Sequence, residues 1–470
     1  MTTPHVTTQP SAAKAAVALL ALALATAAFA APEVHEFTLG NGLKVLVKPD
    51  RRAPVVVSQV WYKVGSSYET EGLTGISHML EHMMFKGTES LGPGKFSRIV
   101  AAEGGRENAF TGQDYTAYFQ SLASDRLEVS LRLEADRMAN LLLRDEDFIK
   151  EREVVTEERR LRTEDQPESL TYETFQAMAY QTSPYRHPVI GWMSDIEHYS
   201  LDDLKGWYRR WYAPNNATLV VVGDVDPPAV RALAERYFGP LKPAAVQSPK
   251  PRPEVEQVGL RRVVVEAPAK LPYLLFGYKA PTAATRPEPW EPYALDVLAA
   301  ILGGDESSRL QSRLVRGEEV AADVGVSYDP YDRMTTLFTI SAVPAQGRSM
   351  DDLEAGVVEE VRRLREEPVL AAELDKVKTQ VVAADVYQLD SVFAQAMRLG
   401  RLETVGLGWR TADEYVPRVR AVTPEQVQAV ARKYLREEAL TMARLKPLPL
   451  SSPVARASAP AAIEGGRHAR

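Results

Sequence analysis

The chain has 470 residues, of which 45% are hydrophobic and 25% charged, a balance typical of globular proteins and sufficient for more than one hydrophobic core. Its formal net charge of -7 argues against nucleic acid as the main partner, because phosphate binding requires a basic surface. The chain has no cysteine, which excludes disulfides and leaves histidine and carboxylate side chains as the ligands for any metal ion.

The first thirty residues have the three regions of a secretory signal peptide. Lys14 precedes an apolar run over residues 15–24, and Ala28, Phe29 and Ala30 form a small-x-small cleavage signal. The run is too short and too rich in alanine to span a bilayer, so cleavage is favoured over a membrane anchor. The sequence therefore predicts an exported protein, periplasmic in a Gram-negative source, with no membrane span after signal cleavage.

The residues that follow predict a sheet with helices packed on it. Two strand patterns, 36–39 and 43–47, flank a Gly-Asn-Gly turn that signals a hairpin, and the β-branched run 55–64 predicts a further strand. Helices are expected over four ranges, 75–84, 94–102, 127–143 and 145–163. Strands mixed with helices in this way indicate an α+β fold.

The two halves of the chain look like copies of one design. In the first half a helix ends at Tyr212 and precedes an apolar strand, 217–222; in the second a helix ends at Tyr434 and precedes a strand, 439–443. Both helices begin with a capping-box pattern. A second pair of segments, 147–150 and 373–376, corresponds at a similar offset. Two matches in the same order favour a duplication over chance similarity.

A Pro-rich stretch between the halves predicts an extended linker, and a Pro/Ser/Ala-rich C-terminus predicts a disordered tail. Both compositions are unsuited to a continuous helix or a central strand. We therefore expect a signal peptide (1–30), a first domain (31–240), a linker (241–258), a homologous second domain (259–446) and the tail (447–470).

Two histidines one helical turn apart carry the chemistry that the sequence indicates. His78 and His82 project from one face of the expected helix 75–84, with Glu81 beside them. Two imidazoles, a further ligand and an open water position are what hydrolytic zinc requires, and H-x-x-E-H is the inverted zinc-peptidase motif. The alternative is a surface helix with two solvated histidines, but the apolar residues around the motif argue against a simple solvent-facing stripe.

The third metal ligand is not part of this motif. Candidates lie on the acidic segment 150–158, where Glu151 and Glu158 are seven residues apart on one helix face and Glu157 points elsewhere. A solvated, charged helix is the alternative for this stretch. Spacing alone does not select the ligand.

Six segments add a signature that is more specific than the motif. They read GISHMLEHMMFKGT (75–88), ENAFT (107–111), DYTAYF (114–119), EREVVTEE (151–158), YAPNNA (212–217) and GDV (223–225). Together they resemble the pitrilysin/insulinase family of inverzincin zinc metallopeptidases, in particular its short bacterial members and the mitochondrial processing peptidase subunits. The resemblance extends over residues 33–445.

This resemblance implies a role for each residue of the site. His78, His82 and Glu158 bind one zinc ion per chain, and Glu81 is the general base. Glu151 matches an upstream glutamate that supports the metal ligands from outside, which is reasonable because metal-bound imidazoles need their other N–H satisfied.

The resemblance also implies a substrate-binding strand at the edge of the sheet. An extended peptide would add to it through main-chain hydrogen bonds. Taken alone, these residues would favour an ordinary Thr/Tyr-rich strand with no ligand. The strand consists of Asn108, Ala109, Phe110 and Thr111.

The second half resembles the inactive copy of the family, with Leu295, Leu298 and Ala299 near the positions of the two histidines and the glutamate. Active members also grip the substrate with an arginine and a tyrosine from this half. Arg316 is present, but Ala322 stands at the tyrosine position, with Tyr328 as the alternative. The resemblance therefore implies a heterodimer with a related subunit that lacks the zinc motif, or else a homodimer.

The sequence thus predicts a zinc metalloendopeptidase that cleaves extended peptides or unfolded polypeptide segments. A different class of function is a non-catalytic structural or partner-binding subunit with the same fold, although such subunits usually have eroded motifs. A third is a periplasmic protein that carries zinc and releases it reversibly. Zinc content and loss of hydrolysis on chelation separate these hypotheses.

Overall fold

The computed structural model describes residues 33–450. The expected signal peptide and residues 451–470 of the expected tail lie outside this range. Within residues 33–450, no helix combines the length and the apolar character needed to cross a bilayer.

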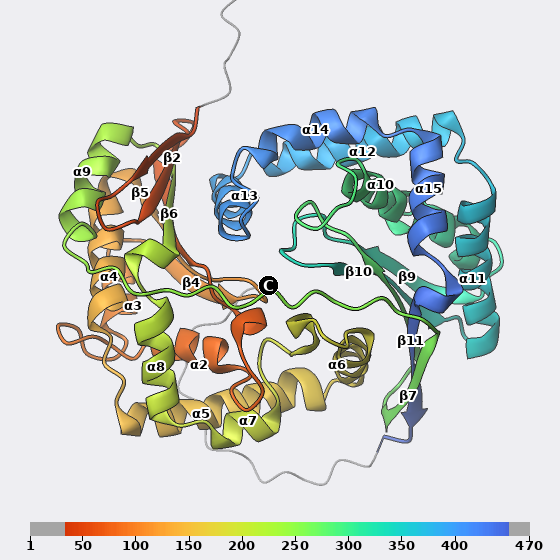
Figure 1. Ribbon diagram of the computed structural model, residues 1–470, viewed down its shortest axis with the longest axis horizontal. Coiled ribbons are helices and arrows are strands. Elements are labelled where there is room, and N and C mark those ends of the chain that lie inside the picture. Colours follow the sequence, from red (N-terminus) through yellow and green to blue (C-terminus); the bar gives the residue numbers. More distant parts are fainter. Residues whose placement is uncertain (1–32, 451–470) are drawn as a thin grey trace, which may run out of the picture.

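The chain folds into two lobes, each built on one sheet (Figure 1). The first sheet has the order β1-β2-β6-β3-β5-β4 and the second has the order β7-β11-β8-β10-β9. The strands of the first sheet are β1 (His35–Thr38), β2 (Lys44–Pro49), β3 (Val55–Tyr62), β4 (Arg106–Thr111), β5 (Thr116–Ala123) and β6 (Ala217–Gly223). Those of the second are β7 (Arg261–Pro268), β8 (Tyr273–Ala280), β9 (Ala321–Ser327), β10 (Thr336–Pro344) and β11 (Leu440–Leu448).

Each lobe contributes its own set of helices. The first lobe contributes α2 (Ile76–Met83), α3 (Lys95–Ala102), α4 (Leu127–Asn140), α5 (Asp145–Arg159), α6 (Pro167–Ala179), α7 (Met193–His198), α8 (Leu201–Trp211) and α9 (Pro227–Tyr237). The second contributes α10 (Glu291–Gly303), α11 (Met350–Glu366), α12 (Ala371–Gln388), α13 (Val392–Thr404), α14 (Thr411–Ala421) and α15 (Pro424–Tyr434). The predicted α+β class with two sheet-plus-helix domains is confirmed.

The strand topology supports the predicted duplication. Without β1, the order β2-β6-β3-β5-β4 of the first sheet matches β7-β11-β8-β10-β9 of the second, strand for strand. The pair β2·β6 is parallel, as is β7·β11, and the three remaining pairs are antiparallel in both sheets. The predicted hairpin is β1–β2, and both predicted capping boxes are present, at Ser200 before α8 and at Thr423 before α15.

Three predicted boundaries differ from the structure. Helix α4 stops at Asn140 instead of residue 143, because Leu141 turns out of the helical region and forms a bridge with Thr88. The α-helix α5 ends at Arg159 instead of residue 163, and the chain continues from there as a π-helical turn, η3 (Arg160–Glu164). Strand β11 continues to Leu448, since it pairs with β7 along its length, so the first two residues of the expected tail belong to the sheet.

Each lobe also covers the free face of the other lobe's sheet. Helix α13 packs on β3 and β6, where Leu399 contacts the cluster that contains Trp61. Helix α6 packs on β11, β7 and β8, where Phe175 lies over the second sheet. The two contacts are close, because a Cβ atom added at Gly400 would lie 2.1 Å from the Trp61 indole nitrogen, and one added at Gly277 would lie 2.3 Å from the Phe175 ring. The lobes are therefore interlocked.

The linker is extended, as its composition predicts, but it is also anchored. Glu254 accepts hydrogen bonds from the backbone N–H groups of Gln181, Thr182 and Ser183, which follow α6 in the first lobe. The same carboxylate lies 2.6 Å from the Lys279 Nζ on β8 of the second lobe. One side chain of the linker thus contacts both lobes.

Candidate metal centre

Helix α2 carries the histidine motif, and groups outside the helix fix its start. The N-cap residue of α2, Gly75, has no side chain that could accept hydrogen bonds from the first N–H groups of the helix. The buried Glu69 does so instead, since it accepts hydrogen bonds from the backbone N–H of Gly75 at 2.7 Å and of Ser77 at 2.8 Å. Burial raises the pKa of Glu69 to about 7, although these two hydrogen bonds act in the opposite direction.

The start of α2 also depends on a close backbone contact. Gly75 has a φ of +86°, in the left-handed region, and a Cβ atom there would lie 2.3 Å from the carbonyl oxygen of Ile190. Gly191, at φ +89°, faces it from the other segment. Only glycine fits this position without displacing the backbone that precedes His78.

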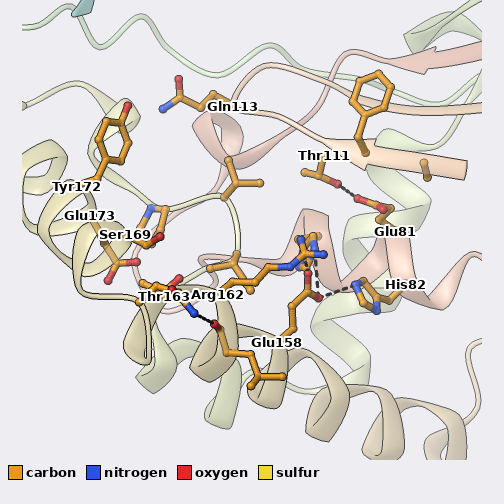
Figure 2. A pocket seen from close by; sticks show the side chains of 18 of the residues that line it. Glu81, His82, Thr111, Gln113, Glu158, Arg162, Thr163, Ser169, Tyr172 and Glu173 are labelled. Carbon is orange, nitrogen blue, oxygen red and sulfur yellow. Dashed lines mark hydrogen bonds and ion pairs between the residues drawn. The ribbon is translucent and has the colours of Figure 1, made fainter. Parts of the chain in front are cut away.

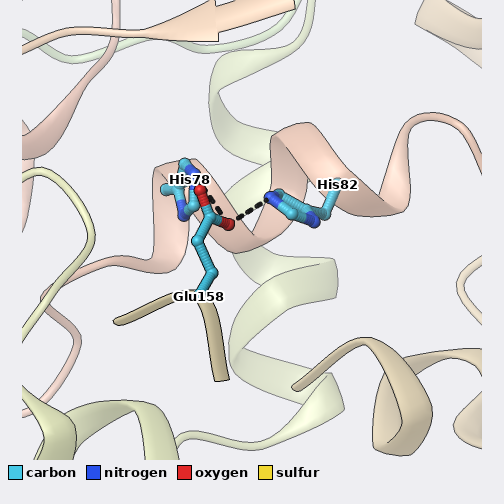
Figure 3. Close-up of side chains that lie close together, drawn as sticks. All are labelled: His78, His82 and Glu158. Carbon is cyan, nitrogen blue, oxygen red and sulfur yellow. Dashed lines mark ion pairs between the residues drawn. The ribbon is translucent and has the colours of Figure 1, made fainter. Parts of the chain in front are cut away.

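The two histidines and Glu158 converge (Figure 3). The imidazole rings of His78 and His82 lie 4.7 Å apart between centroids on α2. Glu158, from α5, brings its Oε2 atom to 3.2 Å from His82 Nε2 and 3.8 Å from His78 Nε2. One donor atom from each of the three residues lies within 4.8 Å of the others, so this cluster could hold a metal ion.

The donor set fits zinc. Zinc in proteins is commonly tetrahedral, with ligands at roughly 2.0–2.2 Å, so its donor atoms lie about 3.3–3.6 Å from one another. The distances of 3.2 and 3.8 Å from Glu158 to the two imidazoles bracket this separation. Two imidazoles and one carboxylate are also the ligands found in zinc hydrolases with an open fourth position.

The second candidate glutamate takes a different place. Glu151 Oε1 lies 2.9 Å from His82 Nδ1, which directs His82 Nε2 toward Glu158. The other oxygen of Glu151 pairs with Lys86, one turn beyond His82. The free oxygen of Glu158 pairs with Arg162 of η3 at 2.7 Å. The structure thus separates two residues that their spacing could not distinguish.

Protonation differs sharply between the two histidines in the metal-free chain. Burial lowers the pKa of His78 to about 3, so this imidazole is neutral. Burial also acts to lower the pKa of His82, but hydrogen bonds to Glu151 and Glu158 outweigh it and raise the value to about 9. Because a metal ion binds the neutral imidazole, zinc would compete with a proton at His82.

Glu81 stands beside the metal ligands and on the same cavity. Its Oε2 accepts a hydrogen bond of 2.6 Å from Thr111 Oγ1 on β4, as Figure 2 shows. Burial raises the pKa of Glu81, and the hydrogen bond from Thr111 acts against this. The carboxylate is therefore held by the strand that the sequence predicts to bind substrate.

A cavity of about 2210 Å³ opens over this cluster. Strand β4 forms one side of it and α5, η3 and α6 form the opposite side, with Tyr172 and Glu173 on α6 visible in Figure 2. Because β4 is the last strand of its sheet, one of its edges has no strand partner among residues 33–450. All four predicted strand residues, Asn108, Ala109, Phe110 and Thr111, line the cavity.

Arg316 is not brought to this site. It follows the turn η6 (Gln311–Val315), is exposed, and donates a hydrogen bond to Ser312 Oγ instead of lining the cavity. Tyr328 is buried, and its hydroxyl donates to the carbonyl oxygen of Pro281. The expected substrate-gripping pair is thus absent from the cavity in this arrangement of the chain.

The equivalent site in the second lobe has no metal ligands. Leu295, Leu298 and Ala299 are buried in the core on α10, the helix that follows β8 as α2 follows β3. Sequence reasoning missed Thr111 as a partner of Glu81, and Lys86 and Arg162 as partners of the two glutamates. Of these three, only Arg162 could have been predicted from the sequence, because it lies four residues after Glu158, a spacing at which helical side chains form ion pairs.

Comparison with known proteins now identifies the family. The sequence matches Insulinase (Peptidase family M16) over residues 44–191 and Peptidase M16 inactive domain over residues 198–381. The zinc protease PqqE of Helicobacter pylori is 36% identical over 365 residues, which cover 77% of this chain and 81% of that protein. The chain belongs to peptidase family M16.

Further relatives cover most of this M16 chain. The uncharacterized zinc protease YmxG of Bacillus subtilis is 25% identical over 86% of this chain and 96% of its own. The crystal structure of a protease from Helicobacter pylori superposes with a TM-score of 0.84 at 33% identity, covering 88% of this chain and 100% of that one. A Pseudomonas fluorescens structure described as a peptidase M16 inactive domain has a TM-score of 0.79 at 20% identity, which shows the fold alone.

Proposed function

We propose that this M16 chain is a zinc metalloendopeptidase that cleaves extended peptides or unfolded polypeptide segments. The observation that carries the proposal is the convergence of His78, His82 and Glu158 beside a buried carboxylate, Glu81, in one large cavity. The names of the relatives, zinc proteases in several bacteria, support the same chemistry.

Each residue of the site would have a distinct task. His78, His82 and Glu158 would hold one zinc ion, which when bound supplies Lewis-acid activation of water and of the scissile carbonyl. Glu81, held by Thr111, would take the proton of the attacking water and deliver it to the leaving amine. Glu151 would keep His82 in the tautomer that presents Nε2 to the metal.

The unpaired edge of β4 supports an extended substrate. A peptide that pairs with this edge would lie alongside Glu81, because Thr111 of the same strand contacts that carboxylate. Main-chain pairing requires an unfolded segment, which fits peptides and unfolded polypeptides better than folded proteins.

Glu81→Gln is the test of the proposed mechanism. The substitution keeps the size and the hydrogen bond from Thr111 but removes the base, so zinc content should stay near one ion per chain while peptide hydrolysis falls at least about a hundredfold. Zinc is measured by elemental analysis and hydrolysis with an unstructured peptide. Hydrolysis at the wild-type rate would refute the role of Glu81, and a wild-type chain that binds zinc but cleaves nothing would favour the non-catalytic subunit.

The absence of Arg316 and Tyr328 from the cavity motivates a proposal about assembly. We also propose export to the periplasm. For the assembly, a related subunit without the histidine motif would supply the substrate-gripping residues in a heterodimer, with a homodimer as the alternative. The purified chain alone should then turn over peptides slowly, and addition of the partner should raise kcat. Full activity of a monomer would reject a need for any partner.

A further inference from the structure

Two apolar side chains of the second lobe line the cavity of the first. Phe393 and Met397 belong to α13 and are four residues apart, so they project from the same side of that helix. Both side chains are only partly buried. The Phe393 ring lies 4.9 Å from the Phe119 ring of β5 in an edge-to-face arrangement, which makes one apolar surface from the two lobes.

The register of β4 shows which part of a bound peptide would meet this surface. Side chains of a strand alternate between the two faces of the sheet. Thr111 points to the face of α2, where it contacts Glu81. Phe110 points to the opposite face, where it packs with α13, and its partner on β5, Ala117, belongs to the same cluster.

A peptide strand paired with β4 would alternate in the same way. Every second side chain would lie on the face of Glu81, and the others would lie on the face of α13. Directly opposite residues in neighbouring strands have Cβ atoms about 4.5–5.5 Å apart, so a peptide side chain opposite Phe110 would contact its ring. The side chains of Phe393 and Met397 line the cavity from α13 on this same face.

We propose that Phe110, Phe119, Phe393 and Met397 form a specificity subsite for a large apolar or aromatic side chain of the peptide. The proposal rests on the proposed function and deepens it, because it names the side-chain class that the same site selects. It also gives the second lobe a part in the reaction. The first lobe holds the proposed metal ligands and the base. Helix α13 of the second lobe would contact a substrate side chain on the opposite face of the first sheet from the histidines.

The test is the cleavage profile of the zinc-loaded full chain on a peptide mixture, read by mass spectrometry. The wild-type chain should favour Phe, Tyr, Leu or Met over Ala at one position by about tenfold or more. Phe393→Ala and Met397→Ala should reduce this preference. Met397→Glu should create a preference for Lys or Arg at the same position, since the new carboxylate would pair with a cationic side chain.

Tyr387→Glu is the matched control, because Tyr387 is 74% exposed on α12 and is not among the residues that line the cavity. It should leave the profile unchanged. A purely structural contact between the lobes would instead lower stability or overall rate in the Phe393 and Met397 variants with the profile preserved. If Met397→Ala and Met397→Glu both fold and keep the wild-type cleavage profile, the proposed subsite is overturned. If Met397→Glu does not fold, Met397→Ala decides the question, since it introduces no charge.

A binding measurement separates this proposal from the proposed function. The zinc-loaded Glu81→Gln chain should bind a fluorescent peptide with an aromatic residue about tenfold more tightly than its alanine analogue, in anisotropy titrations. Met397→Ala in the same background should reduce the difference. Equal affinities for the two peptides refute the subsite even if the wild-type chain cleaves both, whereas a clear difference supports it even if the wild-type chain cleaves neither.

Discussion

At the scale of single residues, two glutamates on one helix face have different surroundings, which support the different tasks proposed for them. Glu158 faces both imidazoles, and Arg162 holds its other oxygen. Glu151 contacts only the far nitrogen of His82 and is fixed by Lys86. The side chain that would bind the metal ion in the proposed function and the one that would orient a ligand are thus separated by two turns of α5.

Glu151→Gln tests this division. The amide cannot accept from His82 Nδ1 and pair with Lys86 as the carboxylate does, so zinc affinity should fall by about 10–100-fold while the fold is kept. Affinity is measured by competition with a chromogenic chelator. Glu157→Gln is the control and should bind zinc as the wild type does, because Glu157 pairs with Arg160 and is not part of the candidate metal cluster. An unchanged affinity in Glu151→Gln would contradict the assigned role.

At the scale of elements, α2 is positioned by residues outside its own sequence. Glu69 satisfies its first N–H groups, and Asp195 accepts hydrogen bonds from the N–H and the hydroxyl of Thr74 just before the helix. The glycine contact between Gly75 and Gly191 fixes the approach of the chain. The placement of the histidines therefore depends on packing that no helix pattern contains.

Gly75→Ala and Gly72→Ala separate backbone strain from steric contact. Both glycines have φ near +87°, at +86° and +88°, but a Cβ at Gly72 meets nothing within 4 Å. Gly72→Ala should therefore cost about 1 kcal/mol of unfolding free energy, and Gly75→Ala about 2 kcal/mol more from the clash with Ile190. Urea unfolding of the chain without metal measures the unfolding free energy of both variants. Equal losses in the two variants would show that the contact between residue 75 and Ile190 adds no cost.

At the scale of the whole molecule, the two copies of the repeat are not independent. Each sheet buries its second face under a helix of the other copy, α13 on the first sheet and α6 on the second. The linker strengthens this arrangement through Glu254, which contacts the segment after α6 and Lys279 of β8. The cavity wall formed by α13 exists only because of this exchange.

The ion pair of Glu254 makes the joint between the lobes sensitive to acid. Burial opposes its charge, but Lys279 and the three backbone N–H groups outweigh burial and lower its pKa from 4.5 to about 2. The folded chain therefore binds fewer protons here than the unfolded chain between these values. The contribution of Glu254 to stability is complete above about pH 4.5 and is lost as the pH falls toward 2.

Glu254→Gln measures this contribution, which is on the order of 3 kcal/mol at pH 7. The difference in unfolding free energy between the wild type and Glu254→Gln should be large at pH 7, smaller at pH 3 and lost only below pH 2. Glu256→Gln, at an exposed neighbouring position, should show little difference at any pH. A difference for Glu254→Gln that is constant with pH would contradict the depressed pKa.

Local patterns were sufficient for much of the fold. The hairpin β1–β2, the strand β3 and the capping boxes of α8 and α15 depend on residues close together in the chain, so their signals are local. The ends of α4, α5 and β11 were not predictable in this way. Helix α4 ends where Leu141 forms a bridge with the distant Thr88, and β11 is extended by its pairing with β7.

The sequence by itself determined that this chain has an α+β repeat, a histidine-glutamate motif on one helix and an acidic helix able to complete it, because helical spacing fixes which side chains share a face. Spacing left Glu151 and Glu158 open and the family resemblance pointed to Glu158; the tertiary structure brings Glu158 to the histidines and Glu151 to the far side of His82. Only the tertiary structure decided that Arg316 lies away from the cavity and that α13 forms part of its wall. These facts depend on the crossing of α2 and α5 and on the packing of one lobe against the other, which are set by contacts between residues far apart in the chain.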